Sequence, residues 1–374
     1  MTSTPLVRCI NEALPEEVLG VIFEEHAKLE WRAPIIDGLV CRQWRQTILR
    51  TPCAWAHLEI RLGLGLAPSK LHQWLGRSGS APLHIEAIDW IEGVEEVLVQ
   101  HCKRIESILL YHHRLDFLEN RSFSNLQSLT IMAWSSNVPV ICWSEWRTMP
   151  ALRYLRDRCI PMDVLPSNIF PRLRDLVLFT VKNCDFIIQS YSHSLTSLMI
   201  CHISLKYTSE PLEFPSLIFL SLFDVKNIKH RMNVPVLTTY HESHGMKEES
   251  FSMSLPSLIE YGIYRFYSEA PLNATKLHQS YPNLTRISVR AGLSVVKPFL
   301  HSLSDQPTAL PILRILALSD SEEYSKEDKD NMRSNVFRRN IASSVKMELC
   351  FDGEVRVPLY FATVRVYMTN FEMT

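Results

Sequence analysis

The sequence lacks an excess of charge of either sign. Lys and Arg number 39 and Asp and Glu number 40 among 374 residues, so the net charge is −1. Such a chain has no global electrostatic field to attract nucleic acid or an anionic membrane. We therefore expect neither as a partner.

The sequence also lacks paired cysteines, a secretory signal and a membrane span. Its nine cysteines are scattered without a Cys-x-x-Cys pair, which is typical of free thiols in a reducing compartment and indicates neither disulfides nor a zinc knuckle. Residues 1–12 contain no basic segment followed by an apolar core, and no apolar run is long enough to cross a bilayer. These absences predict a soluble protein of the cytoplasm or nucleus. Its 46% hydrophobic and 21% charged residues are typical of a globular chain.

A helix-forming, apolar stretch runs from Leu14 to Leu58. Pro15 suits the first turn of a helix, where Glu16 and Glu17 also favour the positive end of the helix dipole. An apolar stripe follows at helical spacing, and a second one precedes Pro52. A unit of fewer than 50 residues is marginal alone, so its apolar surface needs cover from the rest of the chain or from another protein.

Three motifs mark this stretch: Leu-Pro-x-Glu-Val-Leu-x-x-Ile-Phe at 14–23, Val-Cys-x-x-Trp-Arg at 40–45, and Thr-Pro-x-x-Trp at 51–55. In this order and spacing they resemble the F-box, the small helical module by which substrate receptors dock onto a Skp-type adaptor. The version common in mushroom-forming fungi is the most similar, since it also carries an Ala-Pro like Ala33-Pro34. Asp37 departs from that version, which usually has an apolar residue there.

The resemblance implies which side chains contact the adaptor. They are Leu14, Pro15, Val18, Leu19, Ile22, Phe23, Leu39, Val40, Cys41 and Trp44. Among them, Trp44 and Leu39 are the ones we expect to face inward and hold the helices together, whereas Trp55 should pack the module against the first repeat. Spacing alone would favour an ordinary helical core for these stripes, and the three motifs together favour docking.

The rest of the chain carries an internal repeat of the form apolar-Pro-x-Leu-x-x-Leu-x-Leu. Its leading leucines recur mostly every 20 to 22 residues, at 126, 152, 173, 195, 217, 237, 258, 284 and 313. This period and core match leucine-rich repeats, in which each copy adds a short parallel strand and neighbours stack into one core. Residues 59–101 have the form helix, turn, strand and lead into this solenoid.

The repeats depart from the usual leucine-rich pattern after each strand. The Asn that normally bonds between repeats is missing, and apolar residues stand at that offset: Ile160, Val181, Ile203, Val225 and Phe266. We therefore expect apolar packing to close those turns. At the end of the chain, a helix beginning near Ser321 and running toward Arg339 should precede a hairpin of strands 345–351 and 354–357, which would cap the last repeat.

The fold class predicted is thus α+β overall. The expected parts are an F-box module at 11–58, a connecting unit at 59–101, an irregular leucine-rich-repeat solenoid (an α/β horseshoe of parallel strands) at 102–320, and a helix-and-hairpin cap at 321–374.

Candidate catalytic and metal sites are weak. The glycines of Gly76-Arg77-Ser78-Gly79 do not have nucleophile-elbow spacing, so a solvated turn is the better interpretation. Gly63-Leu64-Gly65 lacks the third glycine of a dinucleotide loop. His241-x-x-His244 and His112-His113 lack further ligands nearby, which favours loops over metal sites. We expect no enzyme activity, no metal and no cofactor.

The resemblance implies a substrate-recognition subunit of a Skp–cullin–F-box ubiquitin ligase. The module would hold the adaptor, and through it a cullin, while the repeats hold an unidentified target protein. The alternative is a non-catalytic interaction scaffold that uses an F-box-like module outside any ligase. A hydrolase is a distant third possibility, because no spacing indicates an acid–base group in a pocket.

Overall fold

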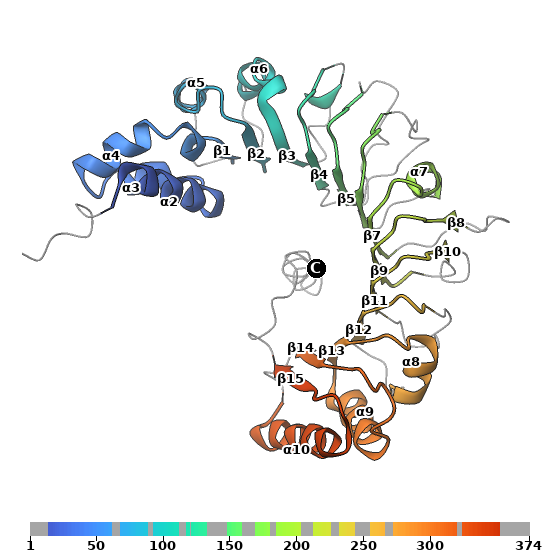
Figure 1. The fold of residues 1–374 in the computed structure, drawn as a ribbon. Coiled ribbons are helices and arrows are strands. Elements are labelled where there is room, and N and C mark those ends of the chain that lie inside the picture. Colours follow the sequence, from blue (N-terminus) through green and yellow to red (C-terminus); the bar gives the residue numbers. More distant parts are fainter. Residues whose placement is uncertain are drawn as a thin grey trace, which may run out of the picture. The chain divides into compact units, whose positions relative to one another are not determined.

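The structure is a computed structural model of the chain (Figure 1). It describes residues 14–61, 68–88, 93–111, 117–119, 121–132, 148–158, 169–179, 185–202, 212–225, 232–243, 255–265, 272–319 and 324–351. The chain forms two compact units, unit 1 at Met1–Ser194 and unit 2 at Leu195–Thr374. The N-terminal helices therefore belong to the same unit as the first repeats.

Unit 1 places a helical module before a sheet of six parallel strands in the order β1-β2-β3-β4-β5-β6. Its helices are α2 (Glu16–Leu29), α3 (Ala33–Asp37), α4 (Arg42–Leu49), α5 (Pro68–Arg77), α6 (Val94–Val99) and α7 (Asp185–Tyr191), with 3₁₀ turns at Pro52–Trp55 and Cys102–Arg104. Its strands are β1 (His57–Ile60), β2 (Leu83–Ala87), β3 (Ile105–Tyr111), β4 (Ser128–Met132), β5 (Tyr154–Arg158) and β6 (Asp175–Phe179). The predicted helices of the module and the predicted helix, turn and strand of 71–87 are confirmed.

Unit 2 continues with parallel strands in the order β7-β9-β11-β12-β13-β14-β15. These are β7 (Ser197–Cys201), β9 (Phe219–Phe223), β11 (Thr239–Ser243), β12 (Glu260–Arg265), β13 (Arg286–Ala291), β14 (Ile315–Ser319) and β15 (Glu348–Phe351). A separate two-stranded sheet pairs β8 (Leu212–Glu213) with β10 (Met232–Asn233), and the helices are α8 (Ala274–Ser280), α9 (Leu293–Asp305) and α10 (Lys326–Ala342). Both units are thus mixed α/β with open parallel sheets, an arrangement compatible with the predicted α/β horseshoe.

Most of the described repeats begin with the same turn. The strand starts two residues after the leading leucine, as Phe219 follows Leu217, and that leucine is fully buried. The N–H of Leu217 donates to the carbonyl of Phe214 at 3.4 Å, which closes a four-residue turn with Pro215 at its second position. Proline suits this position because its φ is already set, and the turn leaves no N–H of that residue to satisfy. The N–H groups of residues 218 and 219 then both donate to the carbonyl of Thr196 in the preceding repeat, at 2.9 and 3.1 Å.

Polar side chains bond between repeats at this turn edge, before the strands. The side-chain amide of Asn125 donates to the carbonyl of Lys103 at 2.7 Å, and that of Asn283 donates to the carbonyl of Pro256 at 2.7 Å. Sequence reasoning missed this ladder, because it looked for an amide after the strand. Of the apolar residues expected to close the turns after the strands, Val225 is buried, and the other four lie outside the described residues.

The C-terminal part differs in detail from its prediction. Helix α10 is confirmed, but its N-cap is Ser325 instead of Ser321: the Ser325 hydroxyl accepts from the N–H of Asp328, whose carboxylate accepts from the Ser325 N–H. Strand β15 pairs in parallel with β14, so it extends the sheet. The predicted second arm at 354–357 lies outside the described residues.

One repeat of unit 2 replaces a core leucine with a carboxylate. Glu242 is buried and accepts hydrogen bonds from the hydroxyls of Tyr240 at 2.7 Å and Tyr261 at 2.5 Å. Burial, and then the nearby Glu242 carboxylate, raise the pKa of both tyrosines well above its usual value. Two neutral hydroxyl donors thereby satisfy an acidic group that the repeat core would otherwise exclude.

On the opposite face of the same strand lies His241, which corrects the expectation of a loop there. It belongs to β11 and is buried, with its ring in edge contact with Phe219 at a centroid distance of 5.3 Å. A Cβ atom on Gly262 of the next strand would lie 2.4 Å from His241 Cδ2. Glycine at position 262 is therefore what makes room for the imidazole.

We predict that Gly262→Ala lowers the free energy of unfolding by about 1–3 kcal/mol, the usual effect of overpacking a buried site. His241→Ser should restore most of that loss in the double variant, because it removes the clashing ring. Gly76→Ala is the matched control, since nothing lies within 4 Å of its added Cβ and the residue is in helix α5. Urea unfolding of the wild type, Gly262→Ala, His241→Ser, the double variant and Gly76→Ala measures these differences, and additive losses in the double variant would contradict the account.

Candidate functional site

Helix α2 has one buried and one exposed apolar side. Leu19, Phe23 and Ala27, at four-residue spacing, are almost fully buried and pack into the helical module. Val18 and Ile22 lie one residue earlier in each turn and remain exposed, as does Val21. A helix of a finished globular core would normally put polar residues on that second side.

The segment after helix α3 presents two further apolar side chains on a firmly held backbone. Leu39 is 71% exposed and Val40 is 55% exposed. Their N–H groups donate to the carbonyls of Ile36 and Asp37, both at 3.1 Å, and Arg45 Nε donates to the carbonyl of Gly38 at 3.0 Å. The exposure of Leu39 and Val40 is therefore fixed by the hydrogen bonds of their own segment.

Asp37, the residue that departs from the expected pattern, has a specific partner. It is buried, and its Oδ2 lies 2.9 Å from Nδ1 of His26 on helix α2. This contact satisfies a carboxylate where an apolar side chain was expected and links α3 to α2. Ile35 and Ile36, which precede it on α3, are both about half exposed.

The start of helix α4 holds the central motif. Cys41 is its N-cap, and its Sγ accepts from the N–H of Trp44 at 3.4 Å. The half-buried Trp44 ring meets Phe23 edge-on at a centroid distance of 5.1 Å. Trp44 thus faces the core of the module, as expected. Cys41 and Trp44 also keep part of their surface accessible to solvent.

The structure corrects part of the predicted docking set. Leu19 and Phe23 lie in the core of the module, where a partner cannot contact them. The apolar residues of the motif cover both the buried and the exposed side of helix α2, and these two lie on the buried side. The expectation that Leu39 faces inward is wrong, since its side chain is 71% exposed. Pro15, Val18, Ile22 and Val40 are exposed, and Leu14, Cys41 and Trp44 are partly so.

Sequence reasoning missed four exposed aliphatic residues on α2 and α3, which are Val21, Leu29, Ile35 and Ile36. Helical spacing carried the signal for Val21, which lies three residues after Val18. We define the docking face as seven exposed aliphatic side chains of α2, α3 and the segment that follows: Val18, Val21, Ile22, Ile35, Ile36, Leu39 and Val40; Leu29, the last residue of α2, is exposed as well and is not part of this set. An apolar set of this kind on a small module is typical of a protein–protein contact.

The helical module is tied to the first strands by tryptophans. Trp55 is buried, and its Nε1 donates to the carbonyl of Ile48 at 2.9 Å. Its ring meets Trp74 of helix α5 edge-on at 4.8 Å, and Arg77 lies 4.5 Å from the same ring. Trp31 contacts Trp74 from the module side at 5.5 Å. Trp55 thus packs the module against helix α5 of the predicted connecting unit 59–101, which precedes the predicted repeats.

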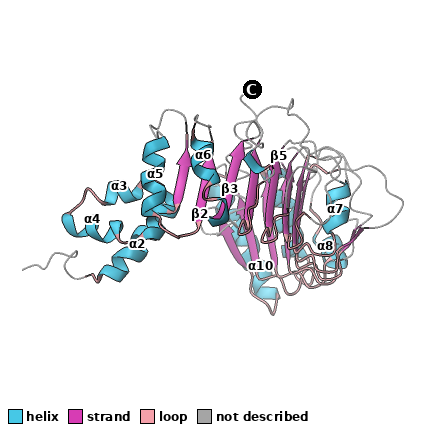
Figure 2. Cartoon of the chain, turned by 90° about the horizontal axis from the view of Figure 1, so that it is seen from above, coloured by secondary structure: helices cyan, strands magenta, loops and turns pink. Residues whose placement is uncertain are grey.

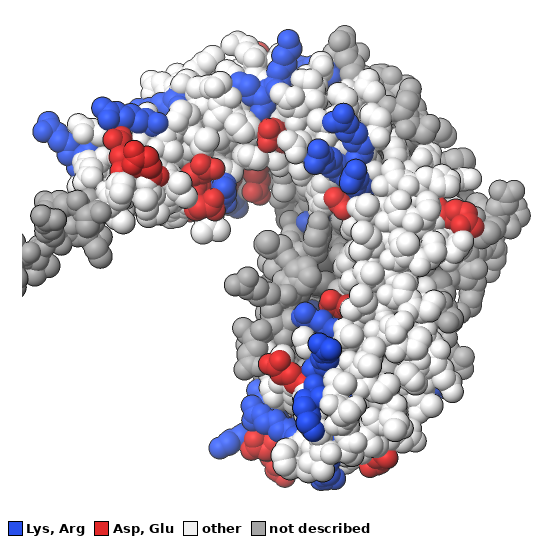
Figure 3. Space-filling model, in the orientation of Figure 1, with Lys and Arg blue, Asp and Glu red and all other residues white. Residues whose placement is uncertain are grey.

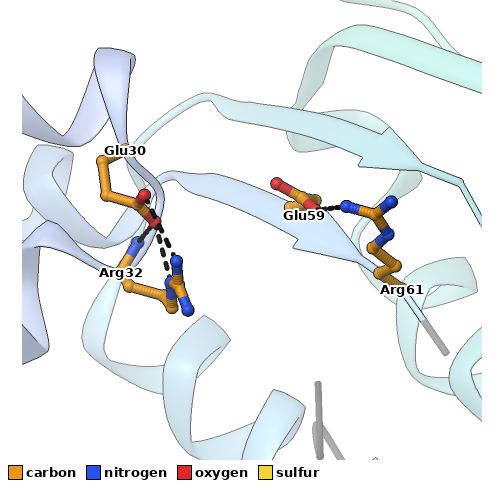
Figure 4. A network of polar contacts seen from close by, with 4 residues as sticks. All are labelled: Glu30, Arg32, Glu59 and Arg61. Carbon is orange, nitrogen blue, oxygen red and sulfur yellow. Dashed lines mark hydrogen bonds and ion pairs between the residues drawn. The ribbon is translucent and has the colours of Figure 1, made fainter. Parts of the chain in front are cut away.

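Charged pairs line the same junction (Figure 4). Arg32 Nε donates to Glu30 at 2.9 Å, and Arg61 lies 3.7 Å from Glu59 on β1. The hydrogen bond from the Arg32 side chain lowers the pKa of the Glu30 carboxyl below its usual value. These side chains are largely solvated, so they contribute little to stability.

A stacked histidine pair lies on neighbouring strands at this junction. The rings of His57 on β1 and His84 on β2 are parallel, with centroids 4.6 Å apart. Burial, and then the charge of His84, lower the pKa of His57 to about 4, and burial lowers the pKa of His84. The charged groups that face the pair are Lys28 and Glu25 of helix α2 and Glu106 of β3.

We predict that unit 1 loses stability as the pH falls from 6.5 toward 4. A histidine with a lowered pKa binds fewer protons in the folded than in the unfolded protein over this window, so acid favours unfolding. Thermal melting of the wild type and of His57→Gln at pH 7.5 and pH 4.5 measures the effect. The variant should lose less of its melting temperature on acidification, and an equal loss in both proteins would contradict the role of the pair.

The other candidate catalytic and metal sites gain no support from the described residues. Ser78 and Gly79 form a turn after helix α5, as predicted, but Ser78 is buried instead of solvated, and its hydroxyl donates to the carbonyl of Leu75. The glycines at 63 and 65, the histidines at 112 and 113, and His244 lie outside the described residues. Across the part of the chain that the structure describes, no three His, Cys, Asp or Glu side chains are grouped to hold a metal ion.

Comparison with protein-family models and with curated proteins finds no match for this chain. Among the described residues, no helix combines the length and the apolar character needed to cross a membrane.

Proposed function

We propose that this chain is the substrate-recognition subunit of a Skp–cullin–F-box ubiquitin ligase. In this proposal, residues 14–58 are an F-box that docks on a Skp-type adaptor, and the parallel-stranded repeats are an irregular leucine-rich-repeat solenoid that holds a target protein. The chain itself does no chemistry. The ligase's partner enzyme modifies a lysine of the target, which the receptor brings close and orients.

The observation that carries the proposal is the docking face. Its seven aliphatic side chains stay about half exposed or more, although the module has a finished core of its own around Leu19 and Phe23. Covering the remaining apolar surface would contribute roughly 5–10 kcal/mol before the cost of association is subtracted. That gain is of the size that a specific protein contact requires.

The tryptophan cluster supports the same role in a second way. Trp31 and Trp55 pack the module directly against Trp74 of helix α5, in the unit that leads into the repeats. A receptor that positions a target relative to the adaptor needs such a stiff connection, because a flexible linker would average the distance over many values.

We predict that Val18→Glu combined with Ile22→Glu weakens binding of the purified Skp-type adaptor by at least tenfold, because two charges would be buried in an apolar contact. Isothermal titration measures the affinity, and an unchanged melting temperature shows that the module remains folded. Phe337→Glu is the matched control, since Phe337 is 66% exposed on helix α10, far along the chain from the docking face.

Adaptor binding at full strength in the Val18/Ile22 variant would overturn the docking assignment. A second measurement separates the ligase from the scaffold role. The wild-type chain, the adaptor and a cullin are mixed and passed over a sizing column. The ligase role predicts one complex of all three, and exclusion of the cullin would favour a scaffold.

A further inference from the structure

Unit 2 has an uncharged strip along the turn edge of its sheet. We define the turn strip as residues 215–218, 235–238, 256–259 and 282–285, which read Pro-Ser-Leu-Ile, Pro-Val-Leu-Thr, Pro-Ser-Leu-Ile and Pro-Asn-Leu-Thr. None of these sixteen residues carries a charge. In the following repeat the equivalent turn, 311–314, ends in the exposed Arg314.

The backbone holds the strip in register. The N–H of Thr238 donates to the carbonyl of Ile218 at 3.0 Å, that of Ile259 to Thr238 at 2.9 Å, and that of Thr285 to Ile259 at 2.9 Å. Neighbouring strands of a sheet lie about 4.8 Å apart, so the side chains at this position form one evenly spaced column. The column alternates isoleucine and threonine, and the Thr238 and Thr285 hydroxyls donate back to the carbonyls of residues 218 and 259, both at 3.3 Å.

The strip is exposed, and its side chains are stiff. Ile218, Val236 and Ile259 are 51%, 44% and 47% exposed, and the four prolines that lead the turns are exposed too. Figure 3 looks onto this edge and shows a broad surface free of charged side chains over β9 to β12, while Figure 2 shows the turns of these strands stacked beside one another. β-Branched residues and prolines lose little conformational entropy when a partner covers them.

Polar groups border the strip on both sides and contact one another. On the side before the turns, Asn233 Nδ2 donates to Glu213 at 2.6 Å. On the strand side, Glu260 Oε1 lies 3.7 Å from His241 Nε2 and 3.5 Å from Arg286 Nε. An apolar centre inside a polar rim is the arrangement of a protein–protein interface.

These features select one class of partner. The N–H groups of the strip's ladder already bond between repeats, so a partner cannot add a strand and must contact side chains. The strip offers no cation for a phosphate, so an anionic lipid or nucleic acid gains nothing there. A protein with an uncharged, apolar surface fits both conditions.

We propose that the turn strip is the docking site for the target protein, which binds it through an uncharged apolar patch. This inference rests on the proposed function, because it locates the target on a substrate receptor. It places the target on the turn edge of unit 2, with Ile218, Val236 and Ile259 as the central contacts.

Site-specific photo-crosslinking tests the proposal. A benzoylphenylalanine replaces Ile218 or Ile259 in the full chain, or Phe337 on helix α10 as the control position, and the chains are irradiated in their source cells with the proteasome blocked. The expected result is one protein crosslinked at both strip positions and not at 337, identified by mass spectrometry. That protein is then purified as the probe.

Binding of this purified protein is measured against matched variants. Ile218→Lys combined with Ile259→Lys should weaken binding at least tenfold. Ile218→Thr combined with Ile259→Thr, which copies the threonines of the same column, should weaken it about two- to fivefold, and Phe337→Lys combined with Ile341→Lys should leave it unchanged. Thermal melting of each variant shows that the repeats remain folded.

Four results would overturn the proposal. They are no crosslinked protein at 218 or 259, a second copy of this chain as the crosslinked species, the same protein crosslinked equally at 337, or an unchanged affinity in the lysine pair. Adaptor binding is titrated in the same preparations and should be unchanged in every strip variant. Failure of the wild type to bind the adaptor would instead count against the proposed function.

Discussion

One repeated set of backbone bonds organises the chain beyond its first helices. In most of the described turns the N–H of a buried leucine closes onto the carbonyl three residues earlier, and the N–H groups that follow bond to the preceding repeat, as those of Ile218 and Phe219 do to Thr196. The leucine thereby points into the core while its own backbone sets the register of the following strand. Because the four neighbouring turns of the turn strip use the same bonds, their side chains outside the core fall into columns. The docking potential of the turn strip is a direct consequence of this regularity.

The two exposed apolar surfaces have different physical origins. The docking face exists because a short helical module has more large aliphatic side chains than its small core can hold, and polar contacts such as those of Arg45 and of His26 with Asp37 keep the surplus facing outward. The turn strip exists because a proline turn cannot bury its outer side against the next repeat. Each surface is held by backbone and polar contacts that do not depend on a partner. Both are therefore ready to bind without a folding step.

Much of this could be predicted from the sequence. The leading leucines located the strands, because a strand begins two residues after each of them, and the motifs at 14–23 and 40–45 located the helices of the module. The direction of individual side chains could not be predicted. Leu19 and Val18 are equally apolar neighbours in one motif, and only the packing of α2 against the rest of the module buries the first and leaves the second exposed. Likewise, the sequence pattern around His241 and Glu242 did not show that β11 points them to opposite faces, one over a glycine and the other between two tyrosines.

The central claim is that the helical module binds an adaptor through its docking face while the repeats remain available. Hydrogen exchange measured by mass spectrometry, with and without the purified Skp-type adaptor, tests it most directly. The account predicts slower exchange in peptides covering 16–29 and 33–41 on addition of the adaptor, and no change in peptides covering 215–285. Protection confined to the repeats, with the module unaffected, would contradict it.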